Sequence, residues 1–244
     1  MLRGLFVTGT DTGVGKTAVA AALLHRYRAD VPLRYWKPIQ TGIEQDDDTA
    51  EVSRLGRCQP NEVLSSGVRL PHAVSPHIAA RLRGCTIRLQ PLIDSILAET
   101  NPRGVHLQVD QGRPTPAATS FETGPTRWIV EGAGGTLVPI NESETIADLM
   151  IRLGLPVVVV TKTTLGTINH TLLTLEALRR RALRVAGVVM VGDRNAENRA
   201  AIERYGDVAV LGEMPSFDLL DAEQLAQWAA TELDPQRQLL ELLR

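Results

Sequence analysis

Glycine, lysine and threonine residues are concentrated in residues 9–17, in an order that suits phosphate binding. The apolar residues 5–7 predict a short strand before this segment, and residues 18–24 predict a helix after it. A glycine-rich turn between a strand and a helix directs backbone N–H groups and the helix dipole at one point, where phosphate can bind. Lys16 adds a positive charge for a terminal phosphate, and the Thr17 hydroxyl suits Mg²⁺.

The spacing differs by one residue from the strict phosphate-loop pattern, which needs glycine where this chain has Thr10. Gly9 lies one residue too early. A glycine-rich turn without a ligand is therefore the alternative interpretation. Because Gly15, Lys16 and Thr17 stand between a strand and a helix, as the motif requires, we predict nucleoside triphosphate binding.

A second lysine, Lys37, follows a β-rich run over residues 31–36 and precedes Pro38. Proline favours an extended conformation at the residue before it, so Lys37 is expected at the carboxyl end of a strand. Open α/β sheets bind ligands at that end. A lysine there can also be merely solvated, but the acidic cluster that follows favours a functional role.

Two carboxylates are candidates for binding Mg²⁺, which usually takes one or two protein carboxylates beside phosphate oxygens and water. Asp48 ends the run 46–48 just before a helical segment, so it is a candidate N-cap, metal ligand or both, although charge runs are often solvated loops. Glu131 follows the strand predicted at residues 127–130 and precedes four residues rich in glycine. It resembles a second metal-facing acid, with a surface glutamate before a flexible turn as the alternative.

Composition limits the class of protein. The chain has 244 residues, 43% of them hydrophobic, which is enough to bury the core of one α/β domain. A formal charge of −2 argues against nucleic acid or an anionic membrane as the main partner. Two isolated cysteines fit a reduced compartment, and the N-terminus leads directly into the first strand. We therefore expect a cytoplasmic protein without a signal peptide.

Strand and helix patterns alternate along the chain, which predicts a single α/β domain over residues 1–244, with a mostly parallel sheet and helices on both faces. Ser75 and Pro76 are expected as N-cap and first residue of a helix. Residues 59–76 are otherwise expected to form loops around the segment Val68-Arg69-Leu70-Pro71. Proline and glycine are frequent in residues 100–127, which predicts a surface loop or insertion there.

Several of these motifs together resemble dethiobiotin synthetase, over residues 5 to about 215. They are the loop of residues 9–17, Lys37-Pro38, Ser75-Pro76-His77, residues 130–135 and residues 165–170. The five-residue spacer between Gly9 and Gly15 is itself the form that this family uses. The resemblance implies a homodimeric phosphate-loop ligase of biotin biosynthesis, which closes the ureido ring of dethiobiotin from 7,8-diaminononanoate, CO₂ and MgATP.

The resemblance also implies roles for individual residues. Those implied in catalysis are Lys37, Lys16 and Thr12, and those implied as Mg²⁺ ligands are Thr17, Asp48 and Glu131. Those implied in nucleotide binding are Gly13, Val14, Gly15, Lys16, Thr17, Ala18, Gly212, Met214 and Pro215. Those implied in binding the diamine are Thr12, Lys37, Thr41, Thr167, Ile168 and Asn169, of which the last three are implied to serve the active site of the opposite subunit.

One departure from the family concerns the base. Residues 189–193 lack the asparagine that often reads adenine, so base recognition is expected to rest on backbone around residues 212–215. Two alternatives share the phosphate chemistry: a nucleotide-driven partitioning switch and another carboxylate-activating ligase. The switch places a lysine where this chain has Asp11, and the other ligases lack the pairing of residues 75–77 with residues 166–169.

Overall fold

Parallel strands form the framework of the protein. The computed structural model describes residues 2–100, 126–217 and 219–244. Within these residues a seven-stranded sheet has the order β4-β2-β6-β1-β7-β8-β9, and every neighbouring pair is parallel. Its strands are β1 (Gly4–Gly9), β2 (Leu33–Trp36), β4 (Val63–Leu64), β6 (Arg127–Gly135), β7 (Val157–Lys162), β8 (Val185–Val191) and β9 (Val210–Met214). The parallel sheet predicted from the sequence is confirmed.

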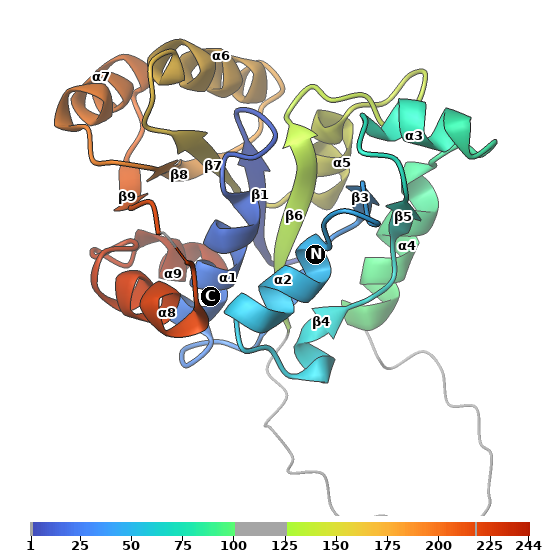
Figure 1. Cartoon of the computed structure of the whole chain (residues 1–244), viewed down its shortest axis with the longest axis horizontal. Helices are drawn as coiled ribbons and strands as arrows, with labels where there is room; N and C mark the ends of the chain where they lie inside the picture. Colours follow the sequence, from blue (N-terminus) through green and yellow to red (C-terminus); the bar gives the residue numbers. More distant parts are fainter. Residues whose placement is uncertain (1, 101–125, 218) are drawn as a thin grey trace, which may run out of the picture.

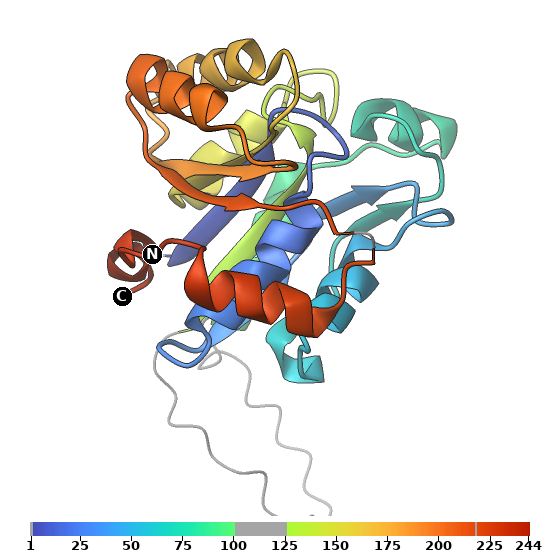
Figure 2. The same cartoon turned by 60° about the vertical axis from the view of Figure 1, so that its left-hand side comes forward.

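Helices cover both faces of this sheet, because its strands send alternate side chains into two apolar layers. In β1, Leu5 and Val7 belong to one layer and Phe6 to the other. The first layer packs against α1 (Lys16–Tyr27), α2 (Asp48–Leu55), α8 (Ala222–Thr231) and α9 (Gln238–Leu243). The second packs against α3 (Pro76–Leu82), α4 (Leu89–Thr100), α5 (Ile146–Leu153), α6 (Thr167–Arg179) and α7 (Ala196–Gly206). Figures 1 and 2 show this three-layer arrangement.

The strand order brings the candidate chemical residues to one edge. β1 lies between β6 and β7, and β6 lies between β1 and β2. Because the strands are parallel, the loop after β1, the residues after β2 and the last part of β6 meet at the same edge, which is the upper one in Figure 1. This is where open α/β sheets bind ligands.

A small second sheet corrects one expectation. Residues 59–76 were expected to form loops around residues 68–71, but β4 lies there, and the segment itself forms β5 (Val68–Leu70), which pairs in parallel with β3 (Ile39–Thr41). These strands have two and three residues, which is too short to give a readable sequence period. Ile39 and Leu70 anchor the pair in the apolar core.

Asp48 was a candidate N-cap for the second helix, and the structure corrects this to Asp47. The Asp47 carboxylate accepts hydrogen bonds from the N–H groups of Thr49 (2.9 Å) and Ala50 (3.0 Å). Asp48 is instead the first helical residue. Its carboxylate is therefore available to the site described below.

Loss of this cap gives a first prediction. Asp47→Ala is expected to lower the free energy of unfolding by about 1 kcal/mol, because two N–H groups at the start of α2 lose their acceptor. Urea denaturation measures the change. The control is Asp46→Ala, because Asp46 is bonded through its backbone carbonyl, which alanine retains. Equal loss in the two variants would contradict the capping role.

Other boundaries follow the sequence prediction. Pro76 is the first residue of α3, and Gly154 ends α5 in the left-handed conformation, with a φ of 65°. The loop or insertion predicted at residues 100–127 lies almost entirely outside the described residues. None of the helices within the described ranges is both long and apolar enough to cross a bilayer.

Candidate active site

The glycine-rich loop joins β1 to α1. Gly13 and Gly15 have φ values of 68° and 98°, a region that a glycine adopts without strain. A β-carbon at Gly15 would also lie 3.1 Å from the side chain of Val191, so the loop packs closely on the end of β8. The first residue of α1 is Lys16, and its Nζ donates to the backbone carbonyl of Asp11 at 2.9 Å. Burial, helped by the positive charge of Lys37, lowers the pKa of Lys16 to about 8.

Three oxygen-bearing side chains meet beside this loop. The hydroxyl of Thr17 lies 3.0 Å from Oδ1 of Asp48 and 3.1 Å from Oε1 of Glu131. Thr17 lies on α1, Asp48 on α2 and Glu131 on β6, so the three come from distant parts of the chain. The residues implied as Mg²⁺ ligands therefore converge on one point.

Lys37 completes the cluster from the opposite side. Its side chain is 2% exposed, and Nζ lies 2.5 Å from Oδ2 of Asp48, 2.7 Å from Oε1 of Glu131 and 3.0 Å from the carbonyl oxygen of Gly132. Burial by itself would lower the pKa of Lys37, but the charges of Glu131 and Asp48 together outweigh it, so the pKa is raised. The ammonium group is therefore charged at neutral pH.

The sequence suggested that Glu131 stands at the end of its strand, but the structure does not have it there. β6 continues to Gly135, and Glu131 is fully buried in its interior, paired in register with Val7 of β1. The ladder with β1 is irregular after this pair, where Gly9 faces Gly135. Glycines at residues 132, 134 and 135 thus extend the strand past the phosphate loop rather than forming a flexible turn.

A cavity of about 670 Å³ lies over this cluster. Of the residues predicted for the site, its lining contains Thr12, Gly13, Gly15, Lys16, Thr17, Ala18, Lys37, Thr41, Asp48 and Glu131. Residues of α2 and of the loop before α3 close its other sides. This volume is within the range of small-molecule sites.

Some predicted residues do not line the cavity. Val14 is buried against the core, next to the position of Gly9. Gly212 lies within β9, Met214 ends the strand and Pro215 follows it; the carbonyl of Met214 accepts from the Gly192 N–H at 2.9 Å. Their part in base recognition stays a prediction.

The segment predicted to bind the diamine carboxylate also lies outside this cavity. The hydroxyl of Thr167 is buried and lies 2.8 Å from the hydroxyl of Thr161 in the same chain. Ile168 packs on the core, and Asn169 is exposed at the start of α6. Within one chain, these three residues do not line the cavity that contains the residues predicted to bind phosphate.

Three residues near the cluster were missed in the sequence. Tyr35 donates from its hydroxyl to Oε2 of Glu131 at 2.9 Å. Gln40 and Arg69 hold backbone next to Asp48 and Lys37. Side chains alternate along a strand, so Tyr35 and Lys37 lie on the same side. This pattern could have predicted Tyr35 from the sequence. No sequence pattern indicated Gln40 or Arg69, because the sheet that positions them was not predicted.

The oxygen donors fit a magnesium ion. A hydroxyl and two carboxylates are hard ligands, and Mg²⁺ typically uses one or two protein carboxylates with substrate phosphates. Within the described ranges there is no cluster of three or more His, Cys, Asp or Glu side chains of the kind that forms a metal cage. The donors from Thr17, Asp48 and Glu131 therefore suit a nucleotide-bound metal better than a structural one.

The parallel sheet, its glycine-rich loop and the lysine at the start of α1 define a phosphate-loop nucleotide-binding protein. The same fold occurs in the septum site-determining protein MinD complexed with Mg-ADP from Pyrococcus horikoshii OT3. The TM-score is 0.51 and the identity 16%, over 100% of this chain and 95% of that one. At this identity the likeness concerns the fold alone.

Closer relatives identify the family. A family model described as an AAA domain matches residues 3–224. ATP-dependent dethiobiotin synthetase BioD of Paramagnetospirillum magneticum is 44% identical over 92% of this chain and 94% of its own length. The Brucella ovis protein of the same name is 39% identical over 91% of this chain and 90% of its own. The chain belongs to the dethiobiotin synthetase family.

Proposed function

We propose that this protein is an ATP-dependent ligase of biotin biosynthesis that forms dethiobiotin from 7,8-diaminononanoate and CO₂, with release of ADP and phosphate. The observation that carries the proposal is a buried ammonium group, Lys37, held between Asp48 and Glu131 beside the phosphate loop. Family membership supports the choice of substrate. The consumption of ATP fits a cytoplasmic location.

The reaction forms two C–N bonds to one carbon. An amine of the substrate attacks CO₂ and loses a proton, which gives a carbamate. A carbamate oxygen then attacks the γ-phosphorus of ATP, and ADP leaves with the electrons of the broken P–O bond. The second amine attacks the carbonyl of the resulting carbamic-phosphoric anhydride, loses a proton and expels phosphate, which closes the ring. No covalent bond to the enzyme is needed.

The residues around the cavity would act by electrostatics and positioning. Negative charge accumulates on oxygen in each step, and fixed cations stabilise it without reorganisation. Lys16 and Lys37 both line the cavity. In the proposed mechanism, Lys16 contacts the terminal phosphates, and Lys37 contacts the carbamate and the transferring phosphoryl group. Thr12 and Thr41 line the same cavity and are proposed to contact the diamine.

Magnesium would be held by Thr17, Asp48 and Glu131. When bound there, it would neutralise phosphate charge and orient the β- and γ-phosphates. The same two carboxylates pair with Lys37 in the structure. The chain thus keeps a positive charge beside Asp48 and Glu131.

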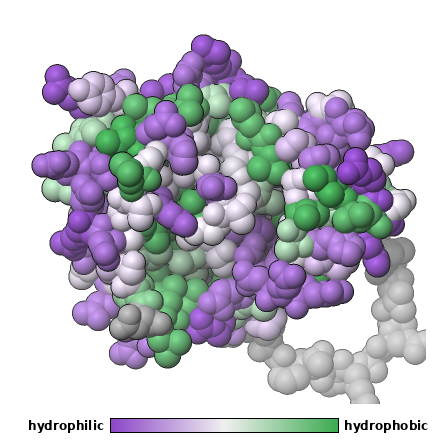
Figure 3. All heavy atoms as spheres, turned by 45° about the horizontal axis from the view of Figure 1, so that its top comes forward, coloured by the Kyte–Doolittle hydropathy of each residue, from purple (hydrophilic) through white to green (hydrophobic). Residues whose placement is uncertain are grey.

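We further propose that the active site is completed in a homodimer. Thr167, Ile168 and Asn169 begin α6, where helix N–H groups suit a carboxylate such as that of the diamine. Leu165 and Leu173 flank them and are 104% and 57% exposed. Contiguous apolar patches mark interaction surfaces, and Figure 3 shows apolar patches on the face around the carboxyl edge of the sheet. A second subunit on this surface would bring Asn169 to the neighbouring cavity.

Hybrid dimers test this arrangement. Lys37→Ala and Asn169→Asp should each be inactive alone, the second because a carboxylate would repel the diamine carboxylate. When the two variants are co-expressed, the hybrid dimer should have about half of wild-type turnover, because one of its two sites combines an intact Lys37 with an intact Asn169. Turnover is measured after separation by two affinity tags. No recovery in purified hybrids would contradict the shared site.

The function itself is tested by phosphate release. With MgATP and bicarbonate, release should depend on 7,8-diaminononanoate and should equal the dethiobiotin formed, as measured by mass spectrometry. Turnover that does not depend on the diamine would overturn the proposal and would favour a nucleotide-driven switch. Turnover with a different amine or carboxylate would favour another ligase on the same fold.

A further inference from the structure

The two-stranded sheet beside the active site raises the question of what its side chains do. β3 and β5 pair so that Gln40 stands opposite Arg69 in the ladder. Side chains of directly paired residues lie on the same face of a sheet. Gln40 and Arg69 therefore project together, toward the chain segment that carries Asp48.

Gln40 holds the chain before Asp48. Its Nε2 donates to the backbone carbonyl of Asp46 at 2.6 Å, and its side chain is 2% exposed. Because a carbonyl oxygen can only accept hydrogen bonds, the Gln40 atom that faces it must be the amide nitrogen, and the bond fixes the orientation of the Gln40 side chain. Gly42 supports the same loop, because its carbonyl accepts from the N–H groups of Gln45 (2.8 Å) and Asp46 (3.0 Å).

Arg69 holds the chain after Asp48 and also the backbone of Lys37. Its Nη1 donates to the carbonyl of Lys37 at 2.9 Å, and its Nη2 donates to the hydroxyl of Thr49 at 3.3 Å. One rigid guanidinium thus joins the backbone of the buried lysine to the first turn of α2. Lysine would not replace it, because a single ammonium lacks this fixed fork.

The surroundings of Arg69 are adapted to this position. Gly67 has a φ of 150°, and a β-carbon there would lie 2.7 Å from Nη1 of Arg69 and 2.8 Å from the carbonyl oxygen of Pro38. A side chain at position 67 would therefore displace the guanidinium. The absence of a side chain at Gly67 leaves the space that Arg69 occupies.

We propose that Gln40 and Arg69 are positioning residues for the metal site: Gln40 holds the backbone before Asp48, Arg69 holds the side chain of Thr49 after it, and together they fix the Asp48 carboxylate against Thr17 and Lys37. This inference rests on the proposed magnesium role of Asp48. Arg69 does not line the cavity, and Gln40, which does, donates its amide N–H to the Asp46 carbonyl. Their effect passes through the position of Asp48, as partners of metal ligands commonly act.

Metal binding without turnover tests the inference. Mn²⁺ is titrated into the protein saturated with ADP, and free Mn²⁺ is followed by electron paramagnetic resonance. Gln40→Met and Arg69→Met should each weaken Mn²⁺ binding about tenfold. Affinity for ADP without metal should be unchanged, because the phosphate loop is untouched. Gln40→Met nearly keeps the side-chain volume, so it tests the inference even if Arg69→Met does not fold.

Two control variants remove similar bonds elsewhere. Arg180→Met breaks an exposed ion pair with Glu176 on α6, and Gln90→Met removes a bond to Asp94 on α4. Both should bind Mn²⁺ like the wild type. The decisive test combines each positioning variant with Asp48→Asn. In these double variants, Mn²⁺ affinity should be no lower than in Asp48→Asn alone.

The outcomes separate the inference from the proposed function. If Asp48→Asn binds Mn²⁺ like the wild type, the proposed metal site falls, and the positioning role with it. If Asp48→Asn weakens binding but Gln40→Met and Arg69→Met do not, only the positioning role is overturned. A full further loss in the Asp48→Asn background would also overturn it, because the two residues would then act elsewhere.

Discussion

Replacing Lys37 with alanine is expected to reduce turnover about 10³-fold, because a fixed cation is lost where negative charge develops on the transferring phosphoryl group. The residual site keeps the phosphate loop and Lys16, so affinity for ATP should change little. Single-turnover phosphate release measures the first quantity, and fluorescence titration with a labelled ATP analogue measures the second.

The chain offers a matched control, because it contains only three lysines. Two of them, Lys16 and Lys37, line the cavity, and the third, Lys162, is exposed at the end of β7. Lys162→Ala should retain both turnover and ATP binding. Normal turnover in Lys37→Ala would contradict the role proposed for this residue. Loss of ATP binding in that variant would indicate that Lys37 binds the nucleotide instead.

Glu131→Gln is expected to lower the free energy of unfolding by about 3 kcal/mol, because it removes one charge of a buried ion pair. Glu131 is fully buried and accepts from Lys37, Thr17 and Tyr35. The amide that replaces its carboxylate keeps the shape but presents N–H donors to groups that need an acceptor. Asp48 still pairs with Lys37, so the expected loss of free energy of unfolding is at the lower end of the range for removing one partner of a buried ion pair. Urea denaturation at pH 7 measures the change.

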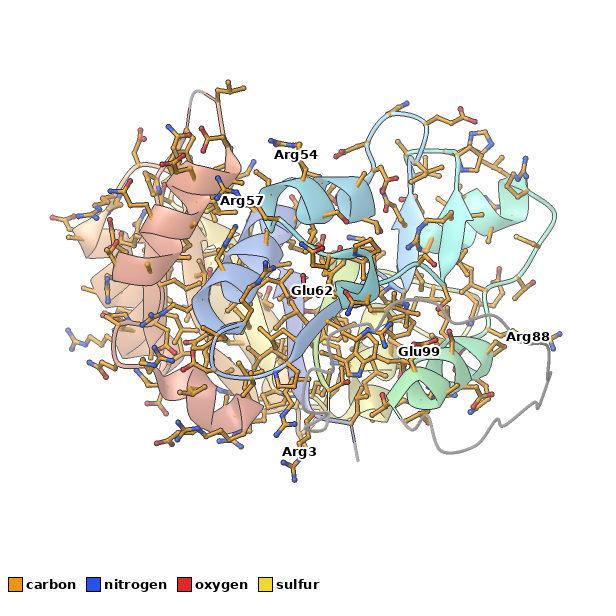
Figure 4. The ribbon with its side chains drawn as sticks, turned by 90° about the horizontal axis from the view of Figure 1, so that it is seen from below. Arg3, Arg54, Arg57, Glu62, Arg88 and Glu99 are labelled. Carbon is orange, nitrogen blue, oxygen red and sulfur yellow. The ribbon has the colours of Figure 1, made fainter. Side chains whose placement is uncertain are left out.

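The control for this variant is an exposed ion pair. Glu99 of α4 pairs with Arg34 at 2.9 Å and is 44% exposed, and Figure 4 shows it beside α4 in the view from below. Glu99→Gln should cost less than about 1 kcal/mol. Glu131→Gln should also weaken Mn²⁺ binding in the presence of ADP, whereas Glu99→Gln should not. Equal stability losses in the two variants would contradict the buried pair.

Local patterns were sufficient for much of the site. The glycine spacing, Lys16 and Thr17 carry the phosphate loop in consecutive residues, so no long-range contact is needed to recognise it. Lys37 was predicted from the conformation that Pro38 imposes, and Glu131 from its place after a buried run. The interior position of Glu131 was missed, because glycine normally weakens a strand and here extends one.

Features that depend on contacts between distant segments could not be read in this way. The choice of Asp47 rather than Asp48 as N-cap depends on how the loop at residues 42–47 is held. The sheet of β3 and β5 consists of three-residue strands, so its pairing is decided by packing on the core. Gln40 and Arg69 gain their contacts only from that pairing.

The sequence by itself determined the alternation of strands and helices, the phosphate loop and the family, because these depend on residue types at short spacing. The tertiary structure decided that Thr17, Lys37, Asp48 and Glu131 form one cluster. It also decided that Thr167, Ile168 and Asn169 lie outside the cavity of their own chain. The physical reason is that parallel crossovers bring residues far apart in sequence to one sheet edge, and spacing along the chain carries no information about which of them meet.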